Sequence, residues 1–133
     1  MLTDEDCLRC ADAPDPLLLA GVRLFNAHHY FECHEVLETA WNAEHAAIRV
    51  LYKGILQVGV GCYHLLRGNY RGAVIKLASG ADYLEPFAPI CMTVDVAHLI
   101  SAARSLREVV VAAGPDAVAS FDHDLLPTIH LIS

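Results

Sequence analysis

The stretch from Tyr30 to Trp41 constrains the fold of this chain more than any other. Its apolar residues recur at intervals of three and four, which places them on one face of an α-helix. These residues are Tyr30, Cys33, Leu37, Ala40 and Trp41. His34 lies at the edge of this face, and Glu38 lies beside it because residues four apart are neighbours on a helix surface. The stretch therefore predicts a packed helix that carries an imidazole and a carboxylate side by side at the border of the core.

The rest of the chain shows the same periodicity between recognisable helix ends. Asp15-Pro16 combines an N-cap acid with a proline at the first helical position, and Gly68-Asn69 ends one helix and caps the next. Helices are predicted over about 16–27, 30–42, 48–67 and 70–84, with a further one from Thr93 or Asp95 to Gly114. No segment alternates with a period of two, so the sequence predicts an all-α, compact bundle of about five helices in a single domain, 1–133.

Both ends of the chain differ from this pattern. Residues 1–14 have no period and predict a flexible arm, whereas residues 115–133 form a C-terminal tail. The apolar part of the tail, Leu125 to Ser133, is broken by Pro127 and is expected to pack on the bundle or on a neighbouring subunit. Hydrophobic residues make up 55% of the chain, above the usual ~45–50%. This surplus predicts a homo-oligomer.

Charge and cysteine content narrow the class of protein. The net charge is -7 and basic residues are spread thinly, so the sequence predicts neither nucleic-acid binding nor binding to an anionic membrane. The most apolar run, 55–66, is much shorter than the ~20 residues of a membrane-spanning helix. The number of cysteines is odd, which is not typical of a disulfide framework, and we expect a soluble protein of the reducing cytoplasm.

The individual cysteines receive structural interpretations. Cys62 and Cys91 are expected to be small buried hydrophobic residues. Cys7-x-x-Cys10 could be half of a zinc site or a redox pair, but it lacks both a second such motif and a strand–helix context. We therefore interpret Cys7 and Cys10 as two cysteines of a loose arm.

Three glycines and a weak internal repeat indicate how the helices pack. Gly54, Gly59 and Gly61 weaken an isolated helix by about 1 kcal/mol each relative to alanine, and they predict the close approach of another helix. The repeat has an offset of 40 and aligns Tyr30 with Tyr70, Cys33 with Ala73, and Leu37 with Leu77. Its turns resemble those of tetratricopeptide repeats, in which tyrosine fills the wedge between two helices. This pattern predicts two stacked helical hairpins followed by a C-terminal helix.

Several motifs occur in the order typical of one small prokaryotic helical family. They are Leu24-Phe25-Asn26, Tyr30-Phe31-Glu32-Cys33-His34-Glu35-Val36-Leu37-Glu38 with Trp41, Gly54-Ile55-Leu56-Gln57, Tyr63-His64, and Gly68-Asn69 with Gly72-Ala73. Through these motifs residues 16–84 resemble the domain of unknown function 309 family. The resemblance implies a compact helical bundle and brings no established activity, substrate or cofactor. Cys33 stands where the family pattern has alanine, and Cys7 to Cys10 and the tail after Gly114 lie outside the resemblance.

The helices 30–42 and 48–67 together suggest a site. Gln57 and His64 are seven apart and share a helix face, so they could meet His34 and Glu38 at the edge of the core. Histidine and carboxylate ligands from facing helices build metal sites in bundles. His34, Glu38 and His64 are therefore candidate ligands of a divalent metal such as zinc or iron. Without a metal, the same pair could act as an acid/base couple, with His34, Glu35 and Glu38 as candidate catalytic residues.

The same residues also fit a structural role. A buried His34 that is hydrogen-bonded to Glu38, with Gln57 and His64 joined to it, forms a satisfied polar network that sets helix register. The assigned supporting residues are Gln57, Glu32, Trp41 and Tyr63. The motif His34-Glu35-Val36-Leu37-Glu38 departs from the zincin motif His-Glu-x-x-His at the second histidine. We therefore interpret the chain as a binding or scaffolding module with a protein partner, and the alternative is a small metal-binding or acid/base enzyme.

Overall fold

The structure, a computed structural model, describes residues 9–120 and 122–132. Its helices are α2 (Pro16–Asn26), α3 (Tyr30–Ala43), α4 (Arg49–Leu66), α5 (Tyr70–Leu84) and α6 (Val96–Ala113). Short elements complete it: η1 (Glu85–Phe87), β1 (Ile90–Cys91), β2 (Val94–Asp95), η2 (Pro115–Ser120) and η3 (His123–Leu125). The predicted all-α bundle is confirmed, and each predicted helix lies within a few residues of an observed one.

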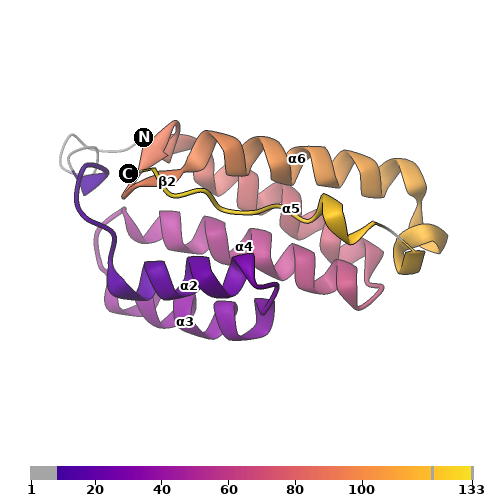
Figure 1. The fold of residues 1–133 in the computed structure, drawn as a ribbon, viewed down its shortest axis with the longest axis horizontal. Helices are drawn as coiled ribbons and strands as arrows, with labels where there is room; N and C mark the ends of the chain where they lie inside the picture. Colours follow the sequence, from indigo (N-terminus) through magenta and orange to yellow (C-terminus); the bar gives the residue numbers. More distant parts are fainter. Residues whose placement is uncertain (1–8, 121, 133) are drawn as a thin grey trace.

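The helices form two hairpins and one added helix (Figure 1). Short turns join α2 to α3 and α4 to α5, and α3 packs against α4, so the two hairpins lie side by side. Helix α6 covers the outer side of α5. Within the described residues, none of the helices is both long and apolar enough to cross a membrane.

The predicted helix ends are found where the capping residues stand. Asp15 Oδ1 accepts a hydrogen bond from the Leu17 N–H at 2.8 Å, with Pro16 in the first turn. Asn69 Oδ1 accepts one from the Gly72 N–H at 2.9 Å and caps α5. Gly68 has a φ of 74°, which glycine adopts without the steric cost of a side chain. Local cap chemistry therefore sets the start of α2 and the turn between α4 and α5.

The two helices α4 and α5 approach each other closely. A methyl group added to Gly54 would lie 2.7 Å from Leu84 Cδ2, and one added to Gly61 would lie 2.9 Å from Leu77 Cγ. Glycine at these positions lets the neighbouring helix come nearer than any side chain would allow. The close approach predicted from the glycines is thus confirmed at two of the three, since Gly59 faces Phe25 at an ordinary 3.6 Å.

A short β-hairpin, which the sequence did not predict, precedes α6. Strands β1 and β2 pair antiparallel, and the turn residues Met92 and Thr93 have φ values of 48° and 66°. Tight hairpin turns with two positive φ angles usually contain Asn-Gly or a similar pair. Because Met-Thr carries no such signal, the sequence predicts no strand here.

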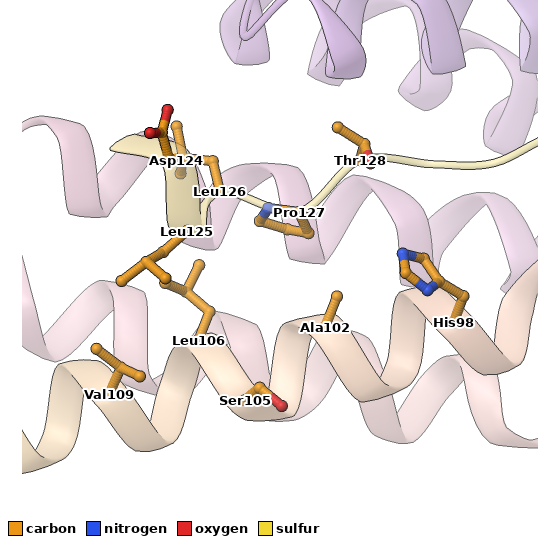
Figure 2. A pocket seen from close by; sticks show the side chains of 10 residues that line it. All are labelled: His98, Ala102, Ser105, Leu106, Val109, Asp124, Leu125, Leu126, Pro127 and Thr128. Atoms are coloured by element: carbon orange, nitrogen blue, oxygen red, sulfur yellow. The ribbon is translucent and has the colours of Figure 1, made fainter. Parts of the chain in front are cut away.

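The C-terminal tail packs on its own bundle, which is one of the two predicted arrangements. Figure 1 shows it running back along α6 towards β2, and Figure 2 shows Leu125, Leu126 and Pro127 facing α6 across a depression of about 280 Å³. Asn26 of α2 makes two hydrogen bonds with the backbone of Ile129. Its Nδ2 donates to the Ile129 carbonyl at 2.9 Å, and its Oδ1 accepts from the Ile129 N–H at 2.7 Å. Leu126 and Ile129 of the tail are buried.

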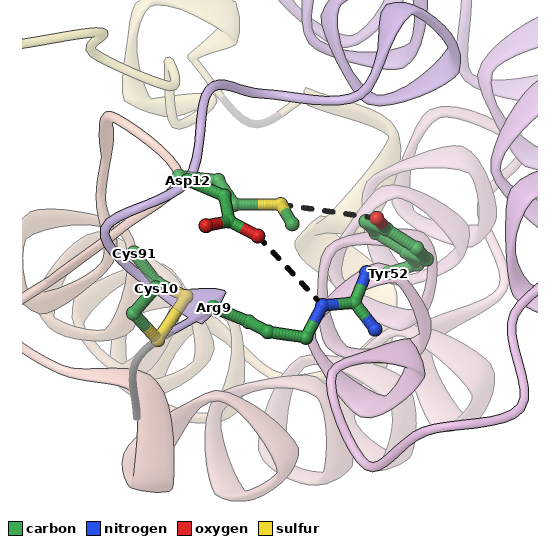
Figure 3. The surroundings of a disulfide bond; sticks show 6 residues. Arg9, Cys10, Asp12, Tyr52 and Cys91 are labelled. Atoms are coloured by element: carbon green, nitrogen blue, oxygen red, sulfur yellow. Dashed lines mark hydrogen bonds and ion pairs between the residues drawn. A yellow bond between two sulfur atoms is a disulfide. The ribbon is translucent and has the colours of Figure 1, made fainter. Parts of the chain in front are cut away.

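The described part of the N-terminal arm is fastened to the bundle, contrary to the predicted flexible arm. Cys10 forms a disulfide with Cys91 of β1 (Figure 3). The Met92 N–H donates to the Cys10 carbonyl at 2.7 Å, and Arg9 Nη2 donates to Glu44 Oε2 at 2.7 Å. The expectations that Cys10 belongs to a loose arm and that no disulfide forms are therefore wrong. Cys91 is buried as predicted but bonded, and Cys7 lies outside the described residues.

Candidate ligand-binding site between α3 and α4

A cavity of about 180 Å³ lies between α3 and α4. Each helix contributes three side chains to its wall: His34, Glu38 and Trp41 from α3, and Lys53, Leu56 and Gln57 from α4. Residues spaced by three or four positions share one helix face. Both helices therefore turn a stripe of long polar and aromatic side chains towards the same space.

His34 and Glu38 are neighbours, as their spacing predicted. The distance between His34 Nε2 and Glu38 Oε2 is 3.4 Å. The two side chains are 38% and 50% exposed, however, so the pair lies at the mouth of the cavity and not in the core. The prediction of a buried His–Glu pair is thus corrected. An imidazole beside a carboxylate in this position can exchange a proton with a molecule in the cavity.

The other two members of the predicted network have different partners. Ser79 Oγ of α5 donates to Gln57 Oε1 at 3.3 Å. His64 Nδ1 lies 3.3 Å from Asn69 Nδ2 at the start of α5. The four side chains therefore form three separate pairs and not the single predicted network.

The predicted metal ligands His34, Glu38 and His64 do not come together. In the described ranges 9–120 and 122–132, no group of three or more His, Cys, Asp or Glu side chains is placed to hold a metal ion. The physical reason is the length of the helix. Seven residues keep Gln57 and His64 on one face, but they also separate them by about 10 Å along the axis, and His64 ends beside Asn69.

The remaining predicted residues are divided between the cavity and the surface. Trp41 lines the cavity. Glu35 and Glu32 are exposed, and Glu35 shares with Glu38 a separate depression on the solvent face of α3. Tyr63 packs against the Phe31 ring with a centroid distance of 6.3 Å and does not line the cavity.

Lys53 also belongs to the site, although the sequence did not predict it. Its Nζ lies 5.6 Å from the centre of the Trp41 ring and 4.8 Å from that of Tyr83 in α5. The Arg49 guanidinium also stacks on Trp41, at 4.2 Å. An ammonium between two aromatic faces is attracted to both and loses freedom of movement. The available signal was the position of Lys53 one turn before Gln57, on the same helix face.

Lys53 has no acidic partner in the part of the chain that the structure describes. The ion pairs found there join Arg9 to Asp12 and Glu44, His34 to Glu38, and Arg104 to Asp82 and Glu85. Glu38 lines the same cavity as Lys53 but pairs with His34. The cavity therefore holds an unneutralised cation on its α4 side and a carboxylate on its α3 side.

Fold and site together define a small bundle of helical hairpins with a ligand-sized cavity between its second and third helices. A family model described as "Domain of unknown function (DUF309)" matches residues 18–75. The match confirms the family resemblance that the sequence motifs indicated. All six residues that line the cavity lie within the matched segment.

A part of the chain is also similar to a curated relative. This is the "Uncharacterized protein YpuF" of Bacillus subtilis (strain 168), which is 39% identical over 57 residues. The alignment covers 42% of this chain and 33% of that protein. The similarity thus spans about a third of the relative's length.

Proposed function

We propose that this protein is a binding module and that the cavity between α3 and α4 takes a small ligand. The observation that carries this proposal is the convergence of Lys53, Glu38, Gln57 and the Trp41 indole on one cavity. A few polar groups that converge on a partly apolar pocket are typical of ligand sites. A volume of about 180 Å³ is below the ~300–1,000 Å³ of sites for drug-sized ligands, so the ligand is small.

The polar groups of the cavity are held in place by neighbours. Trp41 and Tyr83 flank Lys53, Ser79 bonds to Gln57, and Glu38 pairs with His34. Side chains that are already ordered lose less conformational entropy when a ligand binds. This pre-organisation favours a binding role over a solvated surface groove.

The fluorescence of Trp41 offers a direct test, because it is the only tryptophan of the chain. Titration with a library of small polar fragments is expected to give hits that change Trp41 emission. Replacement of Lys53 by Met should weaken those responses, whereas Glu35→Gln, which lies outside the cavity, should leave them unchanged. A library without any Trp41 response, or with equal responses in Lys53→Met and the parent protein, would contradict the proposal.

An acid/base enzyme is the second candidate, and the His34–Glu38 distance of 3.4 Å at the cavity mouth supports it. In that case Glu38 orients the imidazole and His34 moves a proton to or from the bound molecule. His34→Gln would then abolish turnover of a bound compound while its binding persists.

We also propose self-association, which would suit a scaffolding role. Exposed apolar side chains lie at two places along α6 and the tail: Val109 and Leu125 line one depression, and Leu131 and Ile132 lie beside β2. Burial of such side chains against a second copy would remove them from water. Light scattering of the purified protein is expected to give a dimer or larger species, and Val109→Glu should shift it towards the monomer. A monomer at all concentrations would contradict this part of the proposal.

A further inference from the structure

We infer that the ligand of the α3–α4 cavity is a free α-amino acid bound as its zwitterion, an inference that rests on the binding function proposed above. The cavity offers hydrogen-bond donors on one wall, a carboxylate on the opposite wall and an apolar surface between them. An α-amino acid carries the complementary groups on a single carbon atom.

The α4 wall suits a carboxylate. Lys53 and Gln57 are four residues apart and both face the cavity. Gln57 Oε1 already accepts the Ser79 hydroxyl, which leaves the Nε2 end of the amide as the donor. Among residues 9–120 and 122–132, the partners of Lys53 are the rings of Trp41 and Tyr83. An ammonium and an amide N–H one turn apart can each take one oxygen of a ligand carboxylate.

The α3 wall suits an ammonium group. One oxygen of Glu38 lies 3.4 Å from His34 Nε2, and the half-exposed carboxylate retains capacity to accept another donor. A ligand with negative charge only, such as a dicarboxylate or a phosphate ester, would be repelled by Glu38. A ligand with positive charge only would be repelled by Lys53 and by Arg49 on Trp41. A zwitterion is attracted to both walls.

Size and overall charge point to the same class. The cavity volume of about 180 Å³ leaves room for a small metabolite, and Trp41 and Leu56 offer apolar contact to an aliphatic side chain. The chain carries a net charge of -7, which lowers the encounter rate of anionic ligands. A zwitterion has no net charge and does not suffer this repulsion.

The test compares each amino acid with analogues that lack one of its charges. The full chain is titrated at pH 7 with leucine, with 4-methylpentanoate, which lacks the ammonium, and with isopentylamine, which lacks the carboxylate. Alanine and its analogues and phenylalanine and its analogues complete the panel. Trp41 emission reports occupancy in every case. At least one amino acid is expected to bind roughly tenfold or more tightly than both of its analogues.

Two variants assign the charges to the two walls. Lys53→Met should weaken amino acid binding roughly tenfold and should strengthen binding of the amine analogue, because the repelling ammonium is gone. Glu38→Gln should weaken amino acid and amine and should strengthen binding of the carboxylate analogue for the corresponding reason. Glu35→Gln is the matched control, because Glu35 is an exposed acid on the same helix, three residues before Glu38, and does not line the cavity. Lys53→Arg keeps the charge and should retain most of the binding. Circular dichroism confirms the fold of each variant.

The outcomes distinguish this inference from the broader proposal. Amino acids that bind no more tightly than their one-charge analogues, or that bind equally to Lys53→Met, would overturn the assigned ligand class. If fragments of other chemistry still change Trp41 emission in that case, the binding function stands without the amino acid. If neither fragments nor amino acids change it, both the function and the ligand class fall.

Discussion

The two sides of α4 are packed in opposite ways. Towards α5, Gly54 and Gly61 leave so little space that an added methyl group would lie within 3 Å of leucine side chains. Towards α3, the long side chains of Lys53 and Gln57 face Trp41 and leave a cavity of about 180 Å³. Gly54 follows Lys53 directly, and one residue rotates the helix by about 100°. Two residues that are adjacent in the sequence thus belong to different sides of α4: Gly54 to the closely packed α4–α5 interface and Lys53 to the polar cavity.

This difference predicts a separation of roles. Close packing of helices makes stability sensitive to each added or removed atom. Half-exposed polar pairs contribute little to stability, so the α3 side is free to serve binding. Substitutions on the α5 side should therefore change unfolding, and those on the α3 side should change ligand binding. The following substitutions test this division, from the largest expected effect to the smallest.

Gly80→Ala should lower the free energy of unfolding by about 2 kcal/mol. The added methyl group would lie 2.8 Å from the Val58 backbone nitrogen and 3.1 Å from the Gly54 carbonyl oxygen, and backbone atoms cannot move aside as a side chain can. Urea denaturation measures the change. Gly59→Ala is the control, because its methyl group meets Phe25 at 3.6 Å and the substitution improves helix propensity. Equal losses of unfolding free energy in the two variants would show that the α4–α5 interface is no more sensitive to an added methyl group than the site of Gly59.

Glu44→Gln tests the loop that joins α3 to α4, with an expected loss of about 1 kcal/mol at pH 7 after allowance for solvent screening. The hydrogen bond from Arg9, followed by that from the Ala46 N–H, lowers the Glu44 pKa to about 2. A lowered carboxyl pKa stabilises the fold above its unfolded value of 4.5. The difference between parent and variant should therefore shrink as the pH falls from 4.5 to 2. A difference that is unchanged at pH 2 would contradict this account.

His64→Gln tests the end of the α4–α5 interface and should have a smaller effect on the free energy of unfolding. Burial, and then the charge of Lys76, lowers the His64 pKa below its ordinary 6.5. Because the folded state disfavours the imidazolium, the parent protein should lose stability as the pH falls below about 6.5. The variant should lack this loss. Urea denaturation between pH 5 and 8 measures it, and a parent protein that gains stability on acidification through this residue would reverse the assigned sign.

His34→Gln should have the smallest effect, within about 0.5 kcal/mol, because exposed pairs four residues apart contribute only this much. The His34 and Glu38 side chains are 38% and 50% exposed. Thermal unfolding of the variant measures the change, with Trp41 emission as a check on the cavity. A loss above about 2 kcal/mol would instead indicate the buried network that the sequence suggested.

The fold was predictable wherever the determining chemistry is local. Asp15-Pro16 and Gly68-Asn69 set helix ends through contacts within a few residues, so their types and order suffice. The hairpin before α6 was not predictable, because Met92 and Thr93 adopt positive φ angles without a turn signal. The disulfide could not be found either, since Cys10 and Cys91 are 81 residues apart and meet only through that hairpin.

The site follows the same rule. His34 and Glu38 are one turn apart on one helix, and their contact was predicted. His64 was assigned to the same site because it shares a face with Gln57, but a shared face does not bring residues to the same level of a helix. Lys53 was missed because its partners, Trp41 and Tyr83, come from two other helices. Pairs within one helix are thus readable from sequence, whereas groups assembled by packing require the structure.

Both ends of the described chain are bonded to the hairpin of β1 and β2. Cys10 is bonded to Cys91, while the Asp95 N–H donates to the His130 carbonyl and the Ile132 N–H to the Thr93 carbonyl. These contacts place Cys10 and Ile132, near the two described ends, at the same hairpin. A mechanical load applied between them would act on the disulfide and on a few strand hydrogen bonds, and would bypass the helices. A protein held by these two ends would therefore be loaded at the β1–β2 hairpin and not along its helices.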